Sequence, residues 1–379
     1  MQSVACRMRV LWANIVGANY RRANDRLRAM PDTRVNTWND LFPWMKLDSP
    51  RPIDPALIRT KRILITGAGG SVGSALAHEV ASLDPDVLVA LEASEQGLFR
   101  LTQGLRSPHT AVLGSVGDEG LVRELFETHR FDLVLHAAAY KHVPLLESQP
   151  FAAIANNALA TRNLVRLAAE AGTSTLVLLS TDKAVEPVNM LGVSKRIAEL
   201  ATLDAGFTVV RLGNILGSAG SVLPLLQEQL DRGEPLTVTH SEASRYFLTM
   251  PDAVQLLLLA ATEVRGPQLF VPEMGDPILI RDLAERMLAS SNRSPRGILY
   301  TGLRAGEKLH EVLIASDEKV QILPGSPLRA VITPQPDSHV LGATLDALTS
   351  AVQSRNLSQL LDAIHLLVPA YQGQPEVRA

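Results

Sequence analysis

The sequence contains a single cysteine, Cys6, among its 379 residues. One thiol cannot form a disulfide within the chain, and it excludes metal sites built from several cysteines. We therefore predict no metal site and expect a reducing compartment such as the cytoplasm. The formal net charge of -3 also gives no reason to expect a nucleic-acid partner, which would favour a basic surface.

Long apolar runs are missing as well, so the sequence predicts no transmembrane helix. The first 60 residues are nevertheless basic, with ten Arg or Lys against five Asp. Arg7 and Arg9 interrupt the apolar stretch near the start, which is too short for the h-region of a signal peptide. Two interpretations of this basic N-terminal extension stay open. It is either an amphipathic helix on a membrane surface or partner subunit, or a helix packed on its own domain.

From residue 61 onward, short apolar runs alternate with helical patterns. Five runs read as strands, at residues 61–66, 86–91, 131–136, 174–180 and 207–212. Continuous apolar strands separated by helices are typical of a parallel sheet that is covered on both faces. We therefore predict an α/β fold, a Rossmann-type doubly wound parallel sheet with a smaller C-terminal substrate-binding lobe.

The alternation divides the chain into four predicted parts. Residues 1–60 form the basic extension and residues 61–212 the Rossmann core. The pattern loosens over residues 213–320, which we assign to a substrate-binding lobe interleaved with the core. Residues 321–379 form a C-terminal extension, in which a Pro-rich, partly extended connection precedes terminal helices.

Three glycines follow the first predicted strand and open the first predicted helix. Gly67 permits a tight turn, Gly70 lets the backbone approach a pyrophosphate, and Gly73 allows close packing of helix on strand. Glu92 ends the second predicted strand, where a carboxylate accepts ribose hydroxyls and repels a 2′-phosphate. Ser94 could serve the same edge. This pattern predicts a dinucleotide cofactor and favours NAD over NADP.

Polar residues cluster where later predicted strands end. The segment "HAAAYKHVP" places three alanines where a cofactor passes the backbone, followed by Lys141 at the mouth of the cleft. The segment "STDKAVEPVNMLGVSKR" ends another apolar run with Thr181, Asp182 and Lys183, and continues to Lys195. Ligands of such sheets bind beyond the carboxyl ends of the strands, so both segments are candidates for the active site.

Six segments occur in one order and carry a family resemblance: "TGAGGSVG", "HAAAYKHVPLLE", "STDKAVEPVNMLGVSKR", "RLGNILGSAGSVLPLL", "TVTHSEASRYFLTMPDAVQL" and "TGLRAGEKLHEVL". Together they resemble the extended short-chain dehydrogenases/reductases that act as nucleotide-sugar 4,6-dehydratases, of the CapD type in polysaccharide biosynthesis. The resemblance implies a homo-oligomer with bound NAD or NADP. It also implies a UDP-N-acetylhexosamine substrate, UDP-GlcNAc foremost, converted to a UDP-4-keto-6-deoxy sugar.

The resemblance also implies roles for single residues. Asp182 matches the acid at the C6 hydroxyl, Lys183 the base at C5, Thr181 the group that bonds O4, and Lys195 the nicotinamide-ribose contact. A lysine base must be neutral, so we predict that burial beside Lys195 and the oxidised cofactor lowers the pKa of Lys183. The implied cofactor contacts are Gly67, Gly70, Ser71, Val72, Gly73, Glu92, Ser94, Ser115, Val116, Ala137, Ala138, Ala139 and Lys195. The implied substrate contacts are Lys141, Asn214, Arg245, Arg304 and Glu307.

Three positions depart from the family pattern. Leu191 replaces the tyrosine that deprotonates O4 in the short members, while longer members commonly have methionine there and tend to retain the C5 configuration. An apolar side chain cannot relay a proton, so O4 must lose its proton through Asp182, Thr181 or a water. Ser115 stands where an aspartate is usual near the adenine, and Ala219 where an arginine is usual.

These departures keep two other functions open. A nucleotide-sugar 4-epimerase or ketoreductase would share the scaffold, but it relies on the absent tyrosine and needs no Asp182–Lys183 pair. A catalytically impaired dinucleotide-binding partner protein would explain the three departures together. The retention of Asp182, Lys183 and Lys195 favours the 4,6-dehydratase.

Overall fold

The computed structural model describes residues 53–263, 266–291, 297–373 and 375. Most of the predicted basic extension therefore lies outside the described residues. Its last part forms the short helix α3 (Ala56–Arg59), from which Ile58 is buried in the core. Within the described ranges, no helix is both long enough and apolar enough to cross a membrane.

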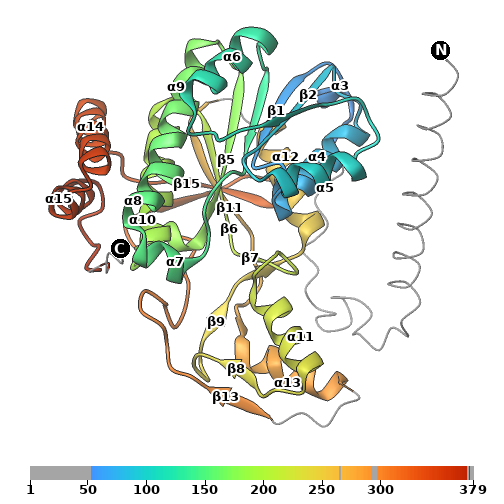
Figure 1. The fold of residues 1–379 in the computed structure, drawn as a ribbon, viewed down its shortest axis with the longest axis vertical. Coiled ribbons are helices and arrows are strands. Elements are labelled where there is room, and N and C mark those ends of the chain that lie inside the picture. The colour runs from blue at the N-terminus through green and yellow to red at the C-terminus, as the bar shows by residue number, and fades with distance from the viewer. Residues whose placement is uncertain (1–52, 264–265, 292–296, 374, 376–379) are drawn as a thin grey trace, which may run out of the picture.

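The centre of the molecule is a nine-stranded sheet in the order β14-β15-β11-β6-β5-β4-β1-β2-β3 (Figure 1). Its strands are β1 (Arg62–Thr66), β2 (Val87–Glu92), β3 (Thr110–Leu113), β4 (Leu133–His136), β5 (Thr175–Thr181), β6 (Thr208–Leu212), β11 (Gln268–Pro272), β14 (Lys319–Ile322) and β15 (Leu328–Ile332). All pairings from β3 to β11 are parallel. The chain reverses its order between β1 and β4, which confirms the predicted Rossmann-type fold.

Four strands of this sheet were not predicted. β3 lies at an edge and is mostly exposed, so its sequence lacks the apolar run of a buried strand. The predicted extended connection contains β15, which pairs antiparallel with β11 and with β14. Prolines flank β15 on both sides, so the segment does not read as a strand in the sequence. The prediction that this segment is a connection was therefore wrong.

Helices cover both faces of the sheet, which explains why the central strands are apolar throughout. Side chains of β1 alternate between the two sides, with Ile63 and Ile65 packed in one cluster and Leu64 in another. The first cluster receives helices α4 (Ser71–Ser82), α5 (Glu95–Gly104) and α12 (Met250–Glu263). The second face carries helices α6 (Glu119–His129), α9 (Ala160–Glu170) and α10 (Met190–Asp204).

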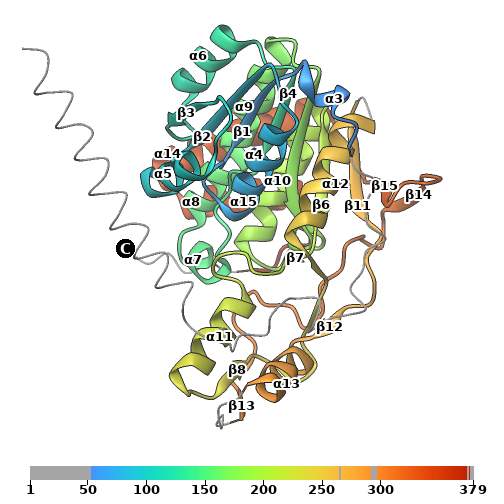
Figure 2. The same cartoon turned by 90° about the vertical axis from the view of Figure 1, so that its right-hand side faces the viewer.

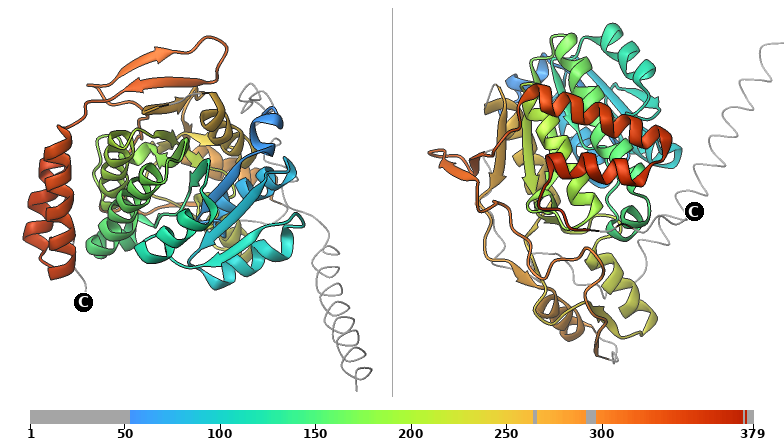
Figure 3. Two further views of the ribbon diagram at one scale, coloured as in Figure 1. Left: turned by 90° about the horizontal axis from the view of Figure 1, so that it is seen from above. Right: turned by 90° about the vertical axis from the view of Figure 1, so that its left-hand side faces the viewer.

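A further layer covers α10 from outside (Figure 3). The predicted terminal helices are α14 (Ser338–Ser354) and α15 (Leu357–Leu367). Their residues Leu345 and Leu360 share a buried cluster with Met190 and Leu191 of α10. The cluster also includes residues of α7 (Val143–Ser148), α8 (Pro150–Ala153) and the π-helix η1 (Ile154–Leu159). The start of α10 is therefore held between the sheet and the C-terminal helices.

A smaller lobe lies beyond the carboxyl ends of the strands (Figure 2). Helices α11 (Val222–Arg232) and α13 (Ile280–Ser290) enclose its own core with the parallel strands β8 (Leu236–Val238) and β13 (Ile298–Tyr300). Two short pairs join it to the rest, β7 (Asn214–Ile215) with β10 (Phe247–Leu248), and β9 (Ser244–Arg245) with β12 (Ile278–Leu279). Between these parts of the lobe, the chain returns to the sheet as α12 and β11.

Candidate active site

A cavity of about 920 Å³ lies between the carboxyl ends of the strands and the lobe. Six segments of the chain line it: the glycine turn after β1, the segment after β4, the end of β5, the start of α10, and the lobe segments around residues 213–222 and 304–311. Fifteen of the predicted site residues are among the lining residues: Gly67, Gly70, Ser71, Val72, Gly73, Ala137, Ala139, Lys141, Thr181, Lys183, Lys195, Asn214, Arg245, Arg304 and Glu307.

The glycine turn leaves no room for side chains. Gly67 has φ +66°, and a Cβ on it would lie 2.6 Å from the backbone of Ala138. A Cβ on Gly73 would lie 2.0 Å from the carbonyl oxygen of Gly67. Gly70 caps α4, so the N-terminus of this helix points its free N–H groups at the cavity. This turn fits the pyrophosphate of a dinucleotide, which needs close approach to the backbone and donors at a helix N-terminus.

Glu92 does not line the cavity but holds the glycine turn from behind. Its carboxylate accepts hydrogen bonds from the backbone N–H groups of Gly69 and Ser94, each at 2.8 Å. A carboxylate offers about four acceptor positions, so room remains for ribose hydroxyls. Ser94 itself caps α5 through a bond from the Gly97 N–H at 3.1 Å.

Three more predicted cofactor contacts lie outside the cavity lining. Ser115 accepts a hydrogen bond from the Gly117 N–H at 3.1 Å and so stabilises its own turn. Val116 is buried in the core cluster of the α6 face. Ala138 meets the glycine turn through its backbone. The structure therefore gives these three residues local structural contacts.

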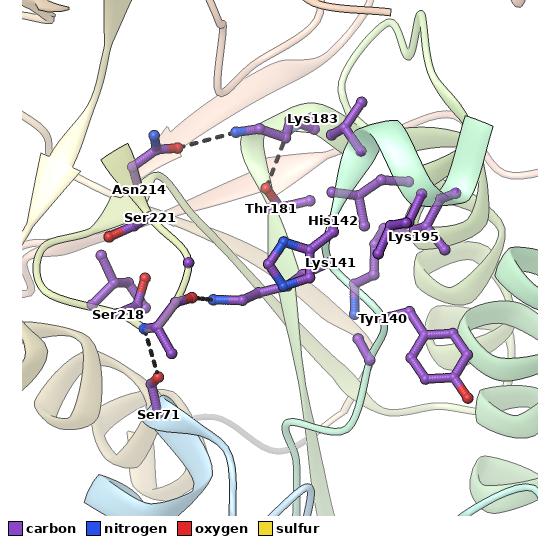
Figure 4. A pocket seen from close by; sticks show the side chains of 18 of the residues that line it. Ser71, Tyr140, Lys141, His142, Thr181, Lys183, Lys195, Asn214, Ser218 and Ser221 are labelled. Carbon is purple, nitrogen blue, oxygen red and sulfur yellow. Dashed lines mark hydrogen bonds between the residues drawn. The ribbon is translucent and has the colours of Figure 1, made fainter. Parts of the chain in front are cut away.

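The catalytic segment begins where β5 ends. Thr181 is the last residue of β5, and the short 3-10 helix η2 (Asp182–Ala184) follows it. The Thr181 hydroxyl donates to Asp182 Oδ1 at 2.9 Å, and Lys183 Nζ donates to the same oxygen at 3.0 Å. Lys183 Nζ also donates to Asn214 Oδ1 at 3.0 Å, as Figure 4 shows. The sequence neighbours thus form one hydrogen-bonded group, in which Asp182 is fully buried and does not line the cavity.

The electrostatics of Lys183 contradict the sequence-based prediction. Burial disfavours its charged form, but the nearby carboxylates of Asp182 and Glu311 outweigh burial and raise the pKa of Lys183 above its ordinary value. The predicted lowering of the Lys183 pKa was therefore wrong, because the sequence does not reveal that two carboxylates meet at this amine.

Lys195 has the lowered pKa that was predicted for Lys183. Its side chain is 4% exposed, and Nζ donates to the carbonyl oxygen of Leu179 at 2.6 Å. Burial lowers the pKa of Lys195 to about 8, although Glu199 opposes this change. Leu191 lines the cavity one turn earlier on α10. Tyr140 also lines the cavity, but Figure 4 shows its hydroxyl pointing away from Lys195.

The lobe contributes a second connected group. Arg245 is buried and donates to the carbonyl oxygens of Ser244 and Leu309, at 2.7 and 3.1 Å, and to Glu307 Oε1 at 3.0 Å. Glu307 Oε2 accepts from the backbone N–H of Arg304 at 3.2 Å. These bonds use three of the five N–H donors of the Arg245 guanidinium, and the other two are not used in them.

Lys141 and Ala219 meet across the cavity. The Lys141 ammonium group donates to the carbonyl oxygen of Ala219, and the Ala219 N–H donates to Ser71 Oγ at 3.1 Å. Burial lowers the pKa of Lys141. A backbone carbonyl at position 219 thus contacts the lysine that was assigned to the substrate.

Two features of the site escaped the sequence analysis. Glu311 lines the cavity beside Lys183, and its only signal is a second glutamate in the motif "GEKLHE". Behind the site, Glu199 accepts hydrogen bonds from Ser180 at 2.6 Å and from Arg211 at 2.8 and 2.9 Å. Arg211 also pairs with Glu318 at 2.7 Å. These buried charges hold the end of β5 against α10 and β6.

Residues 63–326 match a family described as polysaccharide biosynthesis protein. Capsular polysaccharide biosynthesis protein CapD of Staphylococcus aureus is 40% identical over 71% of this chain. The match covers 48% of that relative, so this chain spans about half of its length.

Other relatives are matched over most of their own length. A UDP-N-acetylglucosamine 4,6-dehydratase (inverting) of Campylobacter jejuni is 31% identical, over 69% of this chain and 80% of the relative. A UDP-glucose 4-epimerase of Rickettsia canadensis is 31% identical, over 68% and 79%. The solved structure of Pen from Bacillus thuringiensis has a TM-score of 0.69 at 30% identity, covering 74% of this chain and 91% of Pen. The resemblance inferred from the six motifs is thus confirmed, and this chain belongs to the polysaccharide biosynthesis protein family.

Proposed function

We propose that this chain is a nucleotide-sugar 4,6-dehydratase that converts UDP-GlcNAc to a UDP-4-keto-6-deoxy sugar. The observation that carries the proposal is the hydrogen-bonded group at the end of β5, in which Thr181 and Lys183 line the cavity and Asp182 is buried behind the lining. Removal of water from neighbouring carbons needs a base for one and an acid for the other. A carboxyl group and an amine at 3.0 Å supply both from adjacent residues.

The cofactor that fits this cavity is NAD. The glycine turn would hold its pyrophosphate, Glu92 would accept its ribose hydroxyls, and Lys195 would contact the nicotinamide ribose. When bound, NAD supplies the removal of a hydride from C4 and its return to C6, so no cofactor is consumed overall. The resulting ketone at C4 makes the C5 proton acidic enough for a side-chain base.

The O4 proton leaves through Thr181 to Asp182. Leu191 offers no proton acceptor, whereas the Thr181 hydroxyl already donates to Asp182 Oδ1 at 2.9 Å. Thr181 Oγ can accept the O4 proton while it passes its own proton to Asp182. Asp182 must be ionised to receive it, and it then becomes the carboxylic acid that protonates the departing C6 hydroxyl.

Lys183 in its neutral form takes the C5 proton and later returns it. We propose retention at C5 because Leu191 places the chain beside the longer family members. The UDP group binds between the lobe and the segment after β4: Arg245, Arg304 and Lys141 supply cationic donors, and Glu307 and Asn214 supply acceptors. The carboxylate of Glu307 holds Arg245 in place at 3.0 Å.

A UDP-sugar 4-epimerase is the second candidate, because a relative with that name is 31% identical over 68% of this chain. The two reactions differ in the mass of their products. Purified protein incubated with UDP-GlcNAc should release a product lighter by one water, without net consumption of NAD. A product of unchanged mass would instead identify an epimerase.

The assignment of the base has its own test. Lys183→Ala should abolish water loss while the variant still binds NAD, because Lys183 is assigned to the sugar and not to the cofactor. Fluorescence of added NADH would measure binding, and mass spectrometry would measure turnover. Normal turnover of this variant would rule out Lys183 as the base.

A further inference from the structure

Glu311 is a buried carboxylate in the cavity wall for which the proposed reaction has no role yet. It is 5% exposed and lies in the lobe segment that follows Glu307. Its Oε1 is 3.7 Å from Lys183 Nζ, and its Oε2 is 3.9 Å from Lys308 Nζ. Within the described part of the chain, Oε2 has no hydrogen-bond partner. A buried carboxylate oxygen without a donor is costly and calls for an explanation.

The charged groups around Glu311 come from three segments. Asp182 and Lys183 face it from η2, Arg245 from β9, and Lys308 from its own segment. Arg245 is committed to Glu307, and Lys308 donates to the carbonyl oxygen of Val185 at 2.6 Å. Lys183 is therefore the cation with which Glu311 can exchange a proton most directly.

The reaction requires such an exchange. Lys183 begins as an ammonium group between two carboxylates, yet it must be neutral to accept the C5 proton. Asp182 cannot hold the Lys183 proton, because it receives the O4 proton in the absence of a tyrosine at Leu191. Asn214, the other contact of Lys183, is an amide and accepts no proton at ordinary pH.

We propose that Glu311 takes the proton that Lys183 must lose before Lys183 acts as the base, a step that rests on the proposed dehydration. An N–H bond of the Lys183 ammonium breaks and an O–H bond forms on Glu311, so an ion pair becomes a neutral amine and a carboxylic acid. After C5 is reprotonated, the proton returns from Glu311 to Lys183. Burial raises the pKa of Glu311, which supports its protonation during the cycle.

The pH dependence of turnover tests this role. Internal transfer to Glu311 neutralises Lys183 without loss of a proton to water, so the wild-type rate does not depend on the Lys183 pKa. In Glu311→Gln, Lys183 must release its proton to solvent. At neutral pH, the kcat of Glu311→Gln should be about 100-fold below that of the wild type. The ratio of the variant's kcat to the wild-type kcat should rise about tenfold per pH unit towards alkaline pH.

Two further variants separate this role from packing. Glu311→Asp retains a carboxylate and should give a reduced kcat whose ratio to wild type stays constant with pH. Glu307→Gln changes the neighbouring carboxylate, which pairs with Arg245, and should raise KM for UDP-GlcNAc with a constant kcat ratio. A constant kcat ratio for Glu311→Gln, or a rising one for Glu311→Asp, would overturn the proposal.

An infrared measurement keeps the test independent of product formation. Adding UDP-GlcNAc to the NAD-loaded wild type should produce the carbonyl bands of two protonated carboxyl groups, Asp182 and Glu311. In Glu311→Gln the Asp182 band should remain and the second band should be missing. The same set of bands in both proteins would contradict the role of Glu311. Failure of the wild type to release water would refute the dehydratase function instead.

Discussion

Leu191 occupies the position from which a tyrosine would face Lys195, one helical turn away on α10. Its side chain is 6% exposed and packs in the cluster that the C-terminal helices close. Part of it lines the cavity, so a larger side chain could extend into that space. Leu191 is thus a packing residue that also borders the candidate active site.

Leu191→Tyr, compared with Leu191→Phe, isolates the effect of a hydroxyl at this position. Both rings should lower the free energy of unfolding by about 1–3 kcal/mol, because they overfill a packed cluster. Only the tyrosine restores a proton acceptor near O4, so its kcat should equal or exceed that of the wild type and exceed that of the phenylalanine variant. Equal kcat values for the two variants would show that the hydroxyl does not take part.

The buried charge of Lys195 costs stability at neutral pH. Its pKa in the folded protein is about 8, below its ordinary value of 10.5. Between these values the unfolded chain binds more protons than the folded protein, so stability rises with pH through this window. Below pH 8 both states are protonated and the cost of burial is present in full, on the order of 3 kcal/mol.

Lys195→Met should therefore change stability in a pH-dependent way. Relative to the wild type, the variant should be most stable below about pH 8, and this advantage should shrink as the pH rises towards 10. Urea unfolding of both proteins across this range provides the difference, in which the other titrating groups cancel. A difference that stays constant with pH would mean that Lys195 has no lowered pKa.

At the scale of elements, the turn between β1 and α4 depends on contacts that only glycine allows. Gly73 lies in the first turn of α4, directly against the carbonyl oxygen of Gly67. Gly342 lies inside α14, where an added Cβ would meet no atom within 4 Å apart from the nearby backbone of its own helix. Both glycines have a helical backbone conformation, but only Gly73 is packed closely against another part of the chain.

Gly73→Ala should displace the turn, lower the free energy of unfolding by about 1–3 kcal/mol and strongly weaken NAD binding. Gly342→Ala is the matched control and should stabilise the protein by about 0.5–1 kcal/mol, because alanine favours a helix. Thermal unfolding and titration with NADH would measure both effects. Unchanged NADH affinity in Gly73→Ala would argue against the assigned cofactor site.

At the scale of the whole molecule, the cavity joins the sheet and the lobe. A UDP-sugar in this cavity would contact both, so its binding should stabilise the folded protein as a unit. UDP at about 100 times its Kd should add about 2.7 kcal/mol to the free energy of unfolding. Arg245→Met should remove most of this gain, and calorimetry at increasing UDP concentration would measure it. An undiminished gain in the variant would place UDP elsewhere.

The alternation of apolar runs and helices along the sequence determined the Rossmann-type sheet, since a strand buried on both faces must be apolar throughout. Local motifs also determined most of the cavity lining, because a glycine turn and the end of a strand place their residues by backbone geometry. The strands β3 and β15 were not predicted from the sequence. β3 is exposed at the sheet edge and lacks the apolar run of a buried strand, and prolines on both sides of β15 hide its strand pattern.

Only the tertiary structure decided the charges at the site. Glu311 lies more than a hundred residues from Lys183 in the sequence, and no local pattern brings the two together. Asp182 and Glu311 together raise the pKa of Lys183, against the expected shift, while the burial of Lys195 lowers its own pKa. A pKa depends on every charge within a few ångströms and on access to water, and folding alone sets both.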